Sequence, residues 1–382
     1  MQPGKLRAAL LTAALVFSWA AAAMSTDTAR LAAQLRAVRG KSRLTAAEYA
    51  RFQTQYLEWI DVRMRAARTT DSMNRELTAA GLFPPPTGPT DPDLESNAGY
   101  LDEISTRQIR GASDLVAIGA GIYKGAGCAL DETVILYQRE PLRRLARINA
   151  APERNDYPYY LSGLAAGEKG ASGERLVASG WVVSNCTSTW NGKRIRIDRL
   201  KGHLIDNVLA RDVAAQDREG SDNVAAWTRG DLVTFWYQGA TGDVDLASGP
   251  AIARYRVVGD RAVRERPVAL TRAGFIHEWL EMDDAEAAQW SEPAAMQVHQ
   301  AVVRAFEHRV FEWAHVGTCA GSPPVWEVAV QMDQLKKVHV FRISGSRATE
   351  LRMLSVTDQW TRSCAVVDIR KDLQSVGAEL AW

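Results

Sequence analysis

Acidic residues and one histidine gather between residues 243 and 283, and they are the groups in the sequence best suited to acid–base chemistry. Asp243 and Asp245 stand two residues apart, so both carboxylates face one side of an extended segment. His277, Glu278 and Glu281 follow in a stretch with helical spacing. Paired carboxylates facing a sugar are the groups that glycoside hydrolysis uses. The sequence therefore offers a dispersed carboxylate and histidine site of a hydrolase as one interpretation, and ordinary surface charge as the other.

The same stretch begins like a metalloprotease helix and then departs from it. The segment His277-Glu278-Trp279-Leu280-Glu281 matches the start of H-E-x-x-H, but Glu281 stands where the second histidine belongs. The four cysteines lie too far apart for the close pairs of a zinc site. We therefore expect no metal site and no cofactor, and we expect this helix to pack its apolar residues on a sheet.

Aromatic and basic residues around a predicted hairpin are the candidates for ligand binding. They are Trp236, Tyr255, Arg264 and Arg266. A guanidinium group recognises carboxylates and phosphates through paired donors, so the arginines suggest an anion site. The alternative is a solvated strand face that carries one cross-strand ion pair.

The register of this hairpin follows from its charges. Gly259-Asp260 suits a two-residue turn, since glycine supplies a positive φ. That turn sets Arg254 opposite Glu265 and Arg256 opposite Val263. A slip of one residue would set arginines against arginines and move every side chain to the other face, so we expect the two-residue turn.

Patterns along the whole chain predict a β-rich α+β fold. Residues 24–83 have helical patterns, and the Pro-, Asp- and Thr-rich stretch 84–113 is typical of a linker or a surface loop. About a dozen strand patterns in 114–382 are joined mostly by short connections, which predicts antiparallel meanders in a sandwich or propeller-like arrangement. Helices near 271–307 interrupt the strands, and Ser291 is expected to cap the last of them.

The cysteines are four in number: Cys128, Cys186, Cys319 and Cys364. An even count in an exported chain predicts two disulfides, and three pairings are open. We predict Cys128–Cys186 and Cys319–Cys364. Cys186 falls on the apolar face of a predicted hairpin in the same β region as Cys128, while Cys319 and Cys364 border strands of one meander.

The first residues have the features of a bacterial signal peptide. Lys5 and Arg7 precede the uncharged apolar stretch 8–22, and Ala21-Ala22-Ala23 forms an A-x-A cleavage site. We expect residues 1–23 to be removed, the remaining chain to have no transmembrane segment, and the protein to be periplasmic or secreted.

Composition and the absence of known motifs argue against several classes of function. The 382 residues are 46% hydrophobic and 24% charged with a net charge of +1, so no basic excess favours a nucleic-acid partner. The sequence contains neither G-x-S-x-G nor a phosphate-binding loop. The first interpretation is therefore a non-catalytic binding or envelope-associated protein whose partner is an unknown ligand or an envelope protein, and the alternative is the hydrolase.

We predict that the exported protein begins near Met24, which N-terminal sequencing of periplasmic or secreted material measures. Replacing Leu10 and Leu11 by arginine should block processing, because charges in the apolar stretch prevent its recognition as a signal. An intact N-terminus recovered in the membrane fraction would instead indicate an uncleaved anchor.

Overall fold

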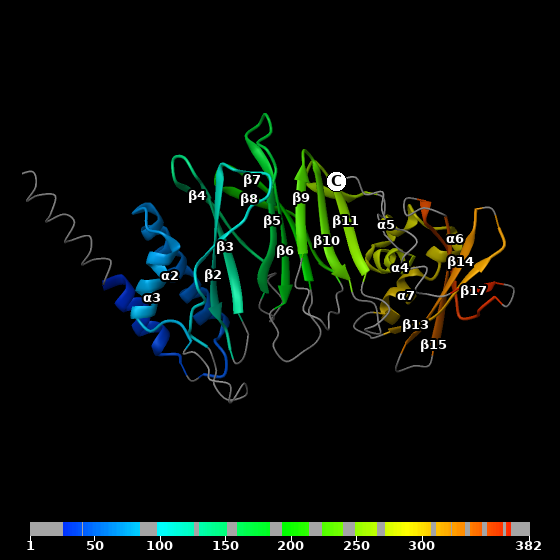
Figure 1. The fold of residues 1–382 in the computed structure, drawn as a ribbon, viewed down its shortest axis with the longest axis horizontal. Coiled ribbons are helices and arrows are strands. Elements are labelled where there is room, and N and C mark those ends of the chain that lie inside the picture. Colours follow the sequence, from blue (N-terminus) through cyan, green and yellow to red (C-terminus); the bar gives the residue numbers. More distant parts are fainter. Residues whose placement is uncertain are drawn as a thin grey trace, which may run out of the picture. The chain divides into compact units, whose positions relative to one another are not determined.

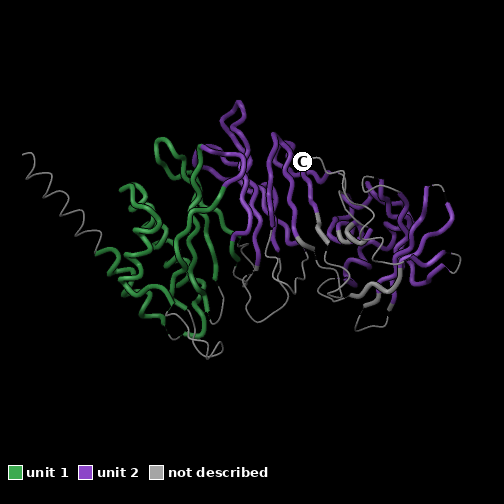
Figure 2. Tube along the Cα trace, in the orientation of Figure 1, with its two compact units in different colours: residues 1–108, 114–160, 184–187 green, residues 109–113, 161–183, 188–382 purple. Residues whose placement is uncertain are grey.

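The computed structural model of the protein describes residues 26–39, 41–84, 98–125, 130–150, 159–183, 193–213, 224–239, 249–265, 272–306, 311–321, 323–332, 337–345, 350–361 and 364–367. The fold is β-rich and antiparallel, with helices at the start and before the last sheet, which confirms the predicted fold class (Figure 1). The chain divides into two units (Figure 2). Unit 1 comprises Met1–Gln108, Asp114–Tyr160 and Ser184–Thr187, and unit 2 comprises the remainder.

Unit 1 begins with helices. They are the helix 26–36, α2 (Ala46–Arg65) and α3 (Thr70–Ala79). Thr45 caps α2: its hydroxyl accepts from the backbone N–H of Glu48 at 3.2 Å, and the Glu48 carboxylate accepts from the N–H of Thr45 at 3.0 Å. Both otherwise unpaired donors are satisfied, so the helix starts at a defined residue.

A fully buried arginine joins these helices. The Nη2 of Arg63 on α2 donates to Oε1 of Glu76 on α3 at 2.6 Å and to the hydroxyl of Thr28 at 2.7 Å. The guanidinium also lies 3.7 Å from the centre of the Trp59 ring. A buried charge is tolerated only when it is paired and hydrogen-bonded, so Arg63 fixes how the helices pack.

The sheet of unit 1 is a four-stranded antiparallel meander. Its strands are β1 (Ser105–Arg107), β2 (Leu115–Tyr123), β3 (Leu130–Gln138) and β4 (Arg143–Asn149), in that order. β1 lies within the stretch 84–113 that was expected to be a linker or a loop. Asp61 of α2 faces the sheet, where it accepts a 2.6 Å hydrogen bond from Tyr137 and pairs with Arg144.

Three antiparallel sheets follow in chain order. The first contains β5 (Tyr159–Ala166), β6 (Glu174–Val183), β7 (Lys193–Lys201) and β8 (Leu204–Val213). The second contains β9 (Val224–Arg229), β10 (Leu232–Gly239), β11 (Gly249–Val258) and β12 (Arg261–Arg264). The third has the order β16-β15-β14-β13-β17 and contains β13 (Phe311–Cys319), β14 (Val325–Met332), β15 (Lys337–Ser344), β16 (Arg352–Thr357) and β17 (Ala365–Val367).

Two glycines let the first two of these sheets meet closely. A Cβ on Gly163 of β5 would lie 2.0 Å from the carbonyl oxygen of Val224, the first residue of β9. A Cβ on Gly180 of β6 would lie 2.2 Å from a methyl carbon of the same valine. Glycine is required at both positions, because any side chain would push β9 away.

In the described residues 272–306, four helices pack on the third sheet: α4 (Arg272–Glu281), α5 (Asp284–Ala288), α6 (Pro293–Met296) and α7 (His299–Phe306). Phe275, Ile276 and Trp279 pack in one core with residues of β14 to β16 such as Phe341 and Met353. No helix in the described part of the chain is both long and apolar enough to cross a membrane.

The expected helix cap at Ser291 is wrong. The N-cap of α6 is Glu292, which makes no side-chain capping bond. The Ser291 hydroxyl instead accepts from the Trp279 indole at 2.8 Å and donates to the carbonyl of Ala287 at 2.7 Å. A buried indole N–H needs a hydrogen-bond acceptor, and the Ser291 hydroxyl serves as that acceptor instead of capping the backbone N–H groups of α6.

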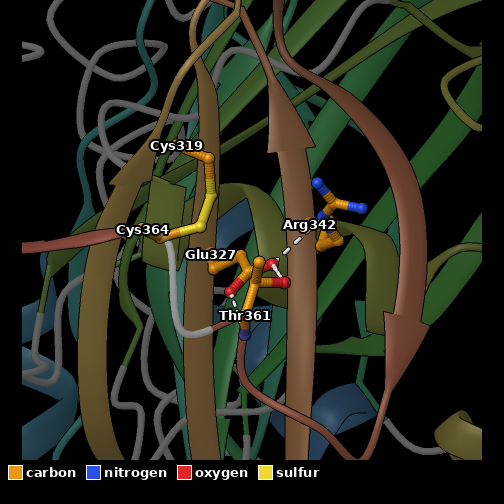
Figure 3. Close-up of a disulfide and its surroundings, with 5 residues drawn as sticks. All are labelled: Cys319, Glu327, Arg342, Thr361 and Cys364. Atoms are coloured by element: carbon orange, nitrogen blue, oxygen red, sulfur yellow. Dashed lines mark hydrogen bonds and ion pairs between the residues drawn. A yellow bond between two sulfur atoms is a disulfide. The ribbon is translucent and has the colours of Figure 1, made fainter.

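The predicted disulfide Cys319–Cys364 is confirmed, and it joins the end of β13 to the residue before β17 (Figure 3). Cys128 and Cys186 lie outside the described residues. Beside the bridge, the fully buried carboxylate of Glu327 pairs with Arg342 at 3.1 Å and accepts hydrogen bonds from the backbone and the hydroxyl of Thr361 (Figure 3). The bridge and the carboxylate together hold the segment before β17 against β14.

Replacing Cys319 and Cys364 by serine should lower the unfolding temperature of unit 2 by several degrees. The bridge spans a sequence separation of 45 residues, and the chain-entropy model gives about 4 kcal/mol for a loop of that size. Calorimetry measures the effect, with Cys128→Ser and Cys186→Ser together as the control that leaves this bridge intact. An unchanged transition, or a non-reducing peptide map that joins Cys128 to Cys319 or Cys364, would contradict the pairing.

Candidate functional site

The predicted register of the β11–β12 hairpin is confirmed, and it decides which candidate residues share a face. Arg256 stands opposite Val263 and Tyr255 opposite Arg264, while the N–H of Glu265 donates to the carbonyl of Arg254 at 2.8 Å. Gly259 in the turn has φ +56°. On the next strand Val233 of β10 stands opposite Tyr255. Because side chains alternate along a strand, Tyr255, Arg264 and Tyr237 of β10 lie on one face of the sheet.

Helix α4 supplies two carboxylates to this face. Arg264 donates from Nη2 to Oε1 of Glu278 at 2.9 Å, and the two side chains are 1% and 2% exposed. The hydroxyl of Tyr237 donates to Oε2 of Glu281 at 3.1 Å. The Arg264 guanidinium also lies 5.8 Å from the centre of the Tyr255 ring. We call these residues the Arg264 cluster: Tyr237, Tyr255, Arg264, Glu278 and Glu281.

A second arginine approaches the cluster from β8. Arg211 pairs through Nη1 with Oε2 of Glu286 on α5 at 2.9 Å, and the same nitrogen lies 3.4 Å from the hydroxyl of Tyr255. The tyrosine hydroxyl is thus bonded to one arginine while its ring lies beside the other. Arg211, Tyr237 and Glu286 were not among the sequence candidates, because each lies on a separate element and nothing in local spacing links them.

Burial and neighbouring charges shift the pKa values of Arg264, Tyr237 and Tyr255. Burial alone would lower the pKa of Arg264, but Tyr255 and the carboxylates of Glu278 and Glu281 outweigh it and raise that pKa. Burial and the charge of Glu281 raise the pKa of Tyr237 well above its ordinary value. Burial likewise raises the pKa of Tyr255. At neutral pH the arginine is therefore charged and both phenols are protonated, with Tyr237 donating to Glu281 and Tyr255 accepting from Arg211.

This arrangement ties helices to strands. The carboxylate of Glu278 pairs with the Arg264 guanidinium, and both groups are buried away from solvent. Glu281, in contrast, is half-buried and accepts a hydrogen bond from Tyr237. A general acid or base must reach the proton it transfers, and Glu278 has no exposed surface for that. Of the predicted catalytic residues in the described part of the chain, Glu281 alone combines partial exposure with a tyrosine neighbour.

The other sequence candidates fall elsewhere. Trp236 is half-buried and, by strand alternation, lies on the opposite face of the sheet from Tyr237. His277 lies in α4, but its side chain is outside the described part of the structure. Asp243, Asp245 and Arg266 also lie outside the described residues. The structure thus brings together Tyr255, Arg264, Glu278 and Glu281, and it separates Trp236 from them.

One group in the described residues has the donor atoms of a metal site: Cys319, Glu327 and Cys364. Both sulfurs are bonded to each other, so neither offers the thiolate that binds metal. Glu327 is also held by Arg342 and Thr361. In the oxidised protein this group is a structural bridge.

Comparisons with known proteins assign no family. No family model and no curated protein matches the sequence. Among solved structures, a mutant α-L-arabinanase from Cellvibrio cellulosa aligns with 74% of this chain and 80% of its own, at 8% identity and a TM-score of 0.22. A score this low does not support an argument for a shared fold or activity.

Glu278→Leu should destabilise unit 2 by about 3–5 kcal/mol, since it leaves the Arg264 charge buried without its partner. The double variant Arg264→Met with Glu278→Leu should recover most of that loss, because an apolar pair needs no charge compensation. Urea unfolding measures both.

The matched control is Arg256→Met on β11, the strand that pairs with the strand of Arg264. Arg256 pairs with Asp231 at 2.9 Å and also with Glu265, and the three side chains are 45%, 53% and 27% exposed. Exposed pairs contribute about 0–1 kcal/mol, so this variant should unfold much like the original chain. If Glu278→Leu were as mild as this control, the buried pair would not hold α4 in place.

Proposed function

We propose that the protein is an exported, non-catalytic binding or envelope-associated protein. The observation that carries this proposal is the buried pair of Arg264 and Glu278, at 2.9 Å with both side chains almost fully excluded from solvent. One of the five candidates for acid–base chemistry, Glu278, is thereby committed to holding α4 on the sheet. A substrate cannot reach it without unpacking the helix.

The neighbouring polar contacts support the same interpretation. Tyr237 joins β10 to Glu281 on α4, and Arg211 joins β8 to Glu286 on α5. Each bond links a strand to a helix, so these polar contacts hold α4 and α5 against the strands. The proposed role of these residues is to make unit 2 rigid enough to present its outer surfaces to a partner.

Export is the second part of the proposal. Its support is the basic start, the apolar stretch 8–22 and the A-x-A site, together with the Cys319–Cys364 bridge, which suits an oxidising compartment. The partner under this proposal is a ligand or an envelope protein, and the Arg264 cluster is its support rather than its contact surface.

Activity measurements on carboxylate variants test the proposal. We expect no turnover above the reagent blank with aryl glycosides, aryl esters and aryl phosphates, for the original chain and for Glu278→Gln and Glu281→Gln alike. The control is Glu168→Gln, which changes the same charge at an exposed position of unit 2. Turnover by the original chain that is lost in Glu281→Gln and kept in Glu168→Gln would overturn the proposal in favour of the hydrolase, with Asp243, Asp245 and His277 as the next residues to replace.

A further inference from the structure

The bridge of Cys319 and Cys364 lies against a buried carboxylate. Both sulfurs and an oxygen of Glu327 lie within 4.8 Å of one another (Figure 3). Gly317 stands opposite Glu327 in the pairing of β13 with β14, so Cys319, two residues further along β13, lies on the same face as Glu327. The N–H of Cys364 donates to the carbonyl of Thr361 at 3.1 Å, and this turn returns the chain to β14. The fold therefore gathers three metal-ligating groups from distant parts of the sequence.

The Glu327 carboxylate is oriented by its partners and keeps the capacity for another. Its Oε2 accepts from the backbone N–H of Thr361 at 2.9 Å. Its Oε1 accepts from the Thr361 hydroxyl and lies 3.1 Å from Nε of Arg342. A carboxylate presents about four lone pairs, so these three contacts leave one position for a cation. Outer partners of this kind fix the direction in which a ligand oxygen points.

The charge of this group depends on the state of the bridge. With the bridge closed, the sulfurs are neutral and Arg342 balances Glu327. With the bridge open and deprotonated, two thiolates and one carboxylate against one guanidinium leave a net charge of −2. Glu327 is fully buried and Cys364 is 6% exposed, so this excess is costly without a counter-ion. One divalent cation neutralises the open form, whereas the closed form is already balanced.

Thiol–disulfide exchange opens the bridge. Cys319 is partly exposed, so a dithiol reductant attacks its sulfur and Cys364 leaves as a thiolate. The second thiol of the reductant then displaces Cys319. Two electrons pass to the bridge, and the reductant departs as a disulfide. The protein now holds two thiols, whose protons are released when a metal ion binds.

The open form fits the geometry of Zn²⁺. Zn–S distances of about 2.3 Å and Zn–O distances of about 2.0–2.2 Å place tetrahedral ligands about 3.5–3.8 Å apart. The three ligand atoms already lie within 4.8 Å of one another, so only small movements are needed. Separation of the two sulfurs itself makes the space between them that the ion occupies.

We propose that the opened bridge is a Zn²⁺ site. The thiolates of Cys319 and Cys364 and a carboxylate oxygen of Glu327 are the protein ligands, and water takes the fourth position. Thiolate ligands favour Zn²⁺ over Mg²⁺ and Ca²⁺. Bridge and ion are thus alternative links between β13 and the segment before β17. This inference goes beyond the proposed function and does not depend on it.

Metal titrations of the full chain test the site. The chain with Cys128→Ser and Cys186→Ser retains only the two cysteines of the bridge. After reduction by a water-soluble phosphine and its removal without air, we expect about one Zn²⁺ per chain, and no binding before reduction. Co²⁺ in place of Zn²⁺ should give sulfur-to-cobalt charge-transfer absorption. If this background does not fold, the original chain should bind one more Zn²⁺ than Cys319→Ser with Cys364→Ser.

A carboxylate variant tests the third ligand. Glu327→Gln keeps the shape of the side chain and should weaken Zn²⁺ binding by about tenfold or more, at least as much as the loss of an outer partner. The control is Glu168→Gln, an equal charge change at an exposed position of unit 2, which should bind like its parent. Near-UV circular dichroism checks that each variant is folded. Glu327→Asp, which withdraws the carboxylate by one methylene, replaces Glu327→Gln if the latter does not fold.

Three results would overturn the inference. They are no Zn²⁺ bound by the reduced chain, Co²⁺ bound without charge-transfer absorption, and unchanged Zn²⁺ affinity in the folded Glu327 variant. Displacement of Zn²⁺ by an equal concentration of Mg²⁺ or Ca²⁺ would also overturn it, because thiolate ligands select against both ions.

Discussion

Buried arginines paired with carboxylates are the constraint on which the packing of both units depends. Arg63 joins α2 to α3 through Glu76 in unit 1, and Arg264 joins β12 to α4 through Glu278 in unit 2. A guanidinium taken out of water needs its carboxylate partner in place, so each pair favours the arrangement of helix and neighbouring element in which the pair forms. Such pairs contribute little net stability compared with apolar packing, and their effect is to make a single arrangement the favoured one.

Local features of the sequence were sufficient to predict the hairpin but not the cluster beneath it. Gly259 and the alternation of charges around Arg254 and Glu265 determine the register, because all these residues are neighbours across one turn. The sequence also offered four members of the cluster as candidates, because they lie close together in the chain, in the hairpin and in the helix that follows it. They are Tyr255, Arg264, Glu278 and Glu281. Arg211 reaches Tyr255 across a separation of 44 residues, and only the stacking of elements brings them together.

The error at Ser291 has the same origin. Serine before Pro293 satisfies the local rule for a helix start, but the indole of Trp279 approaches from another helix and takes the hydroxyl. The separation of Trp236 from Arg264 followed from alternation along the strands once the pairing of β10 with β11 was known. Local chemistry therefore predicted elements and registers here, whereas the assignment of polar side chains to partners required the tertiary structure.

The contact of Gly163 and Gly180 with Val224 restricts which sequences can adopt this structure. Two neighbouring strands must each present bare backbone at the point where a third strand begins, and no adjustment of a rotamer relieves a Cβ placed about 2 Å from a carbonyl oxygen or a methyl group. The constraint at Gly163 comes from the Val224 backbone and holds whatever residue stands at 224, whereas the constraint at Gly180 comes from the Val224 side chain and depends on its size. Residues 180 and 224 can therefore change only together, while residue 163 must stay glycine as long as β9 begins at this place.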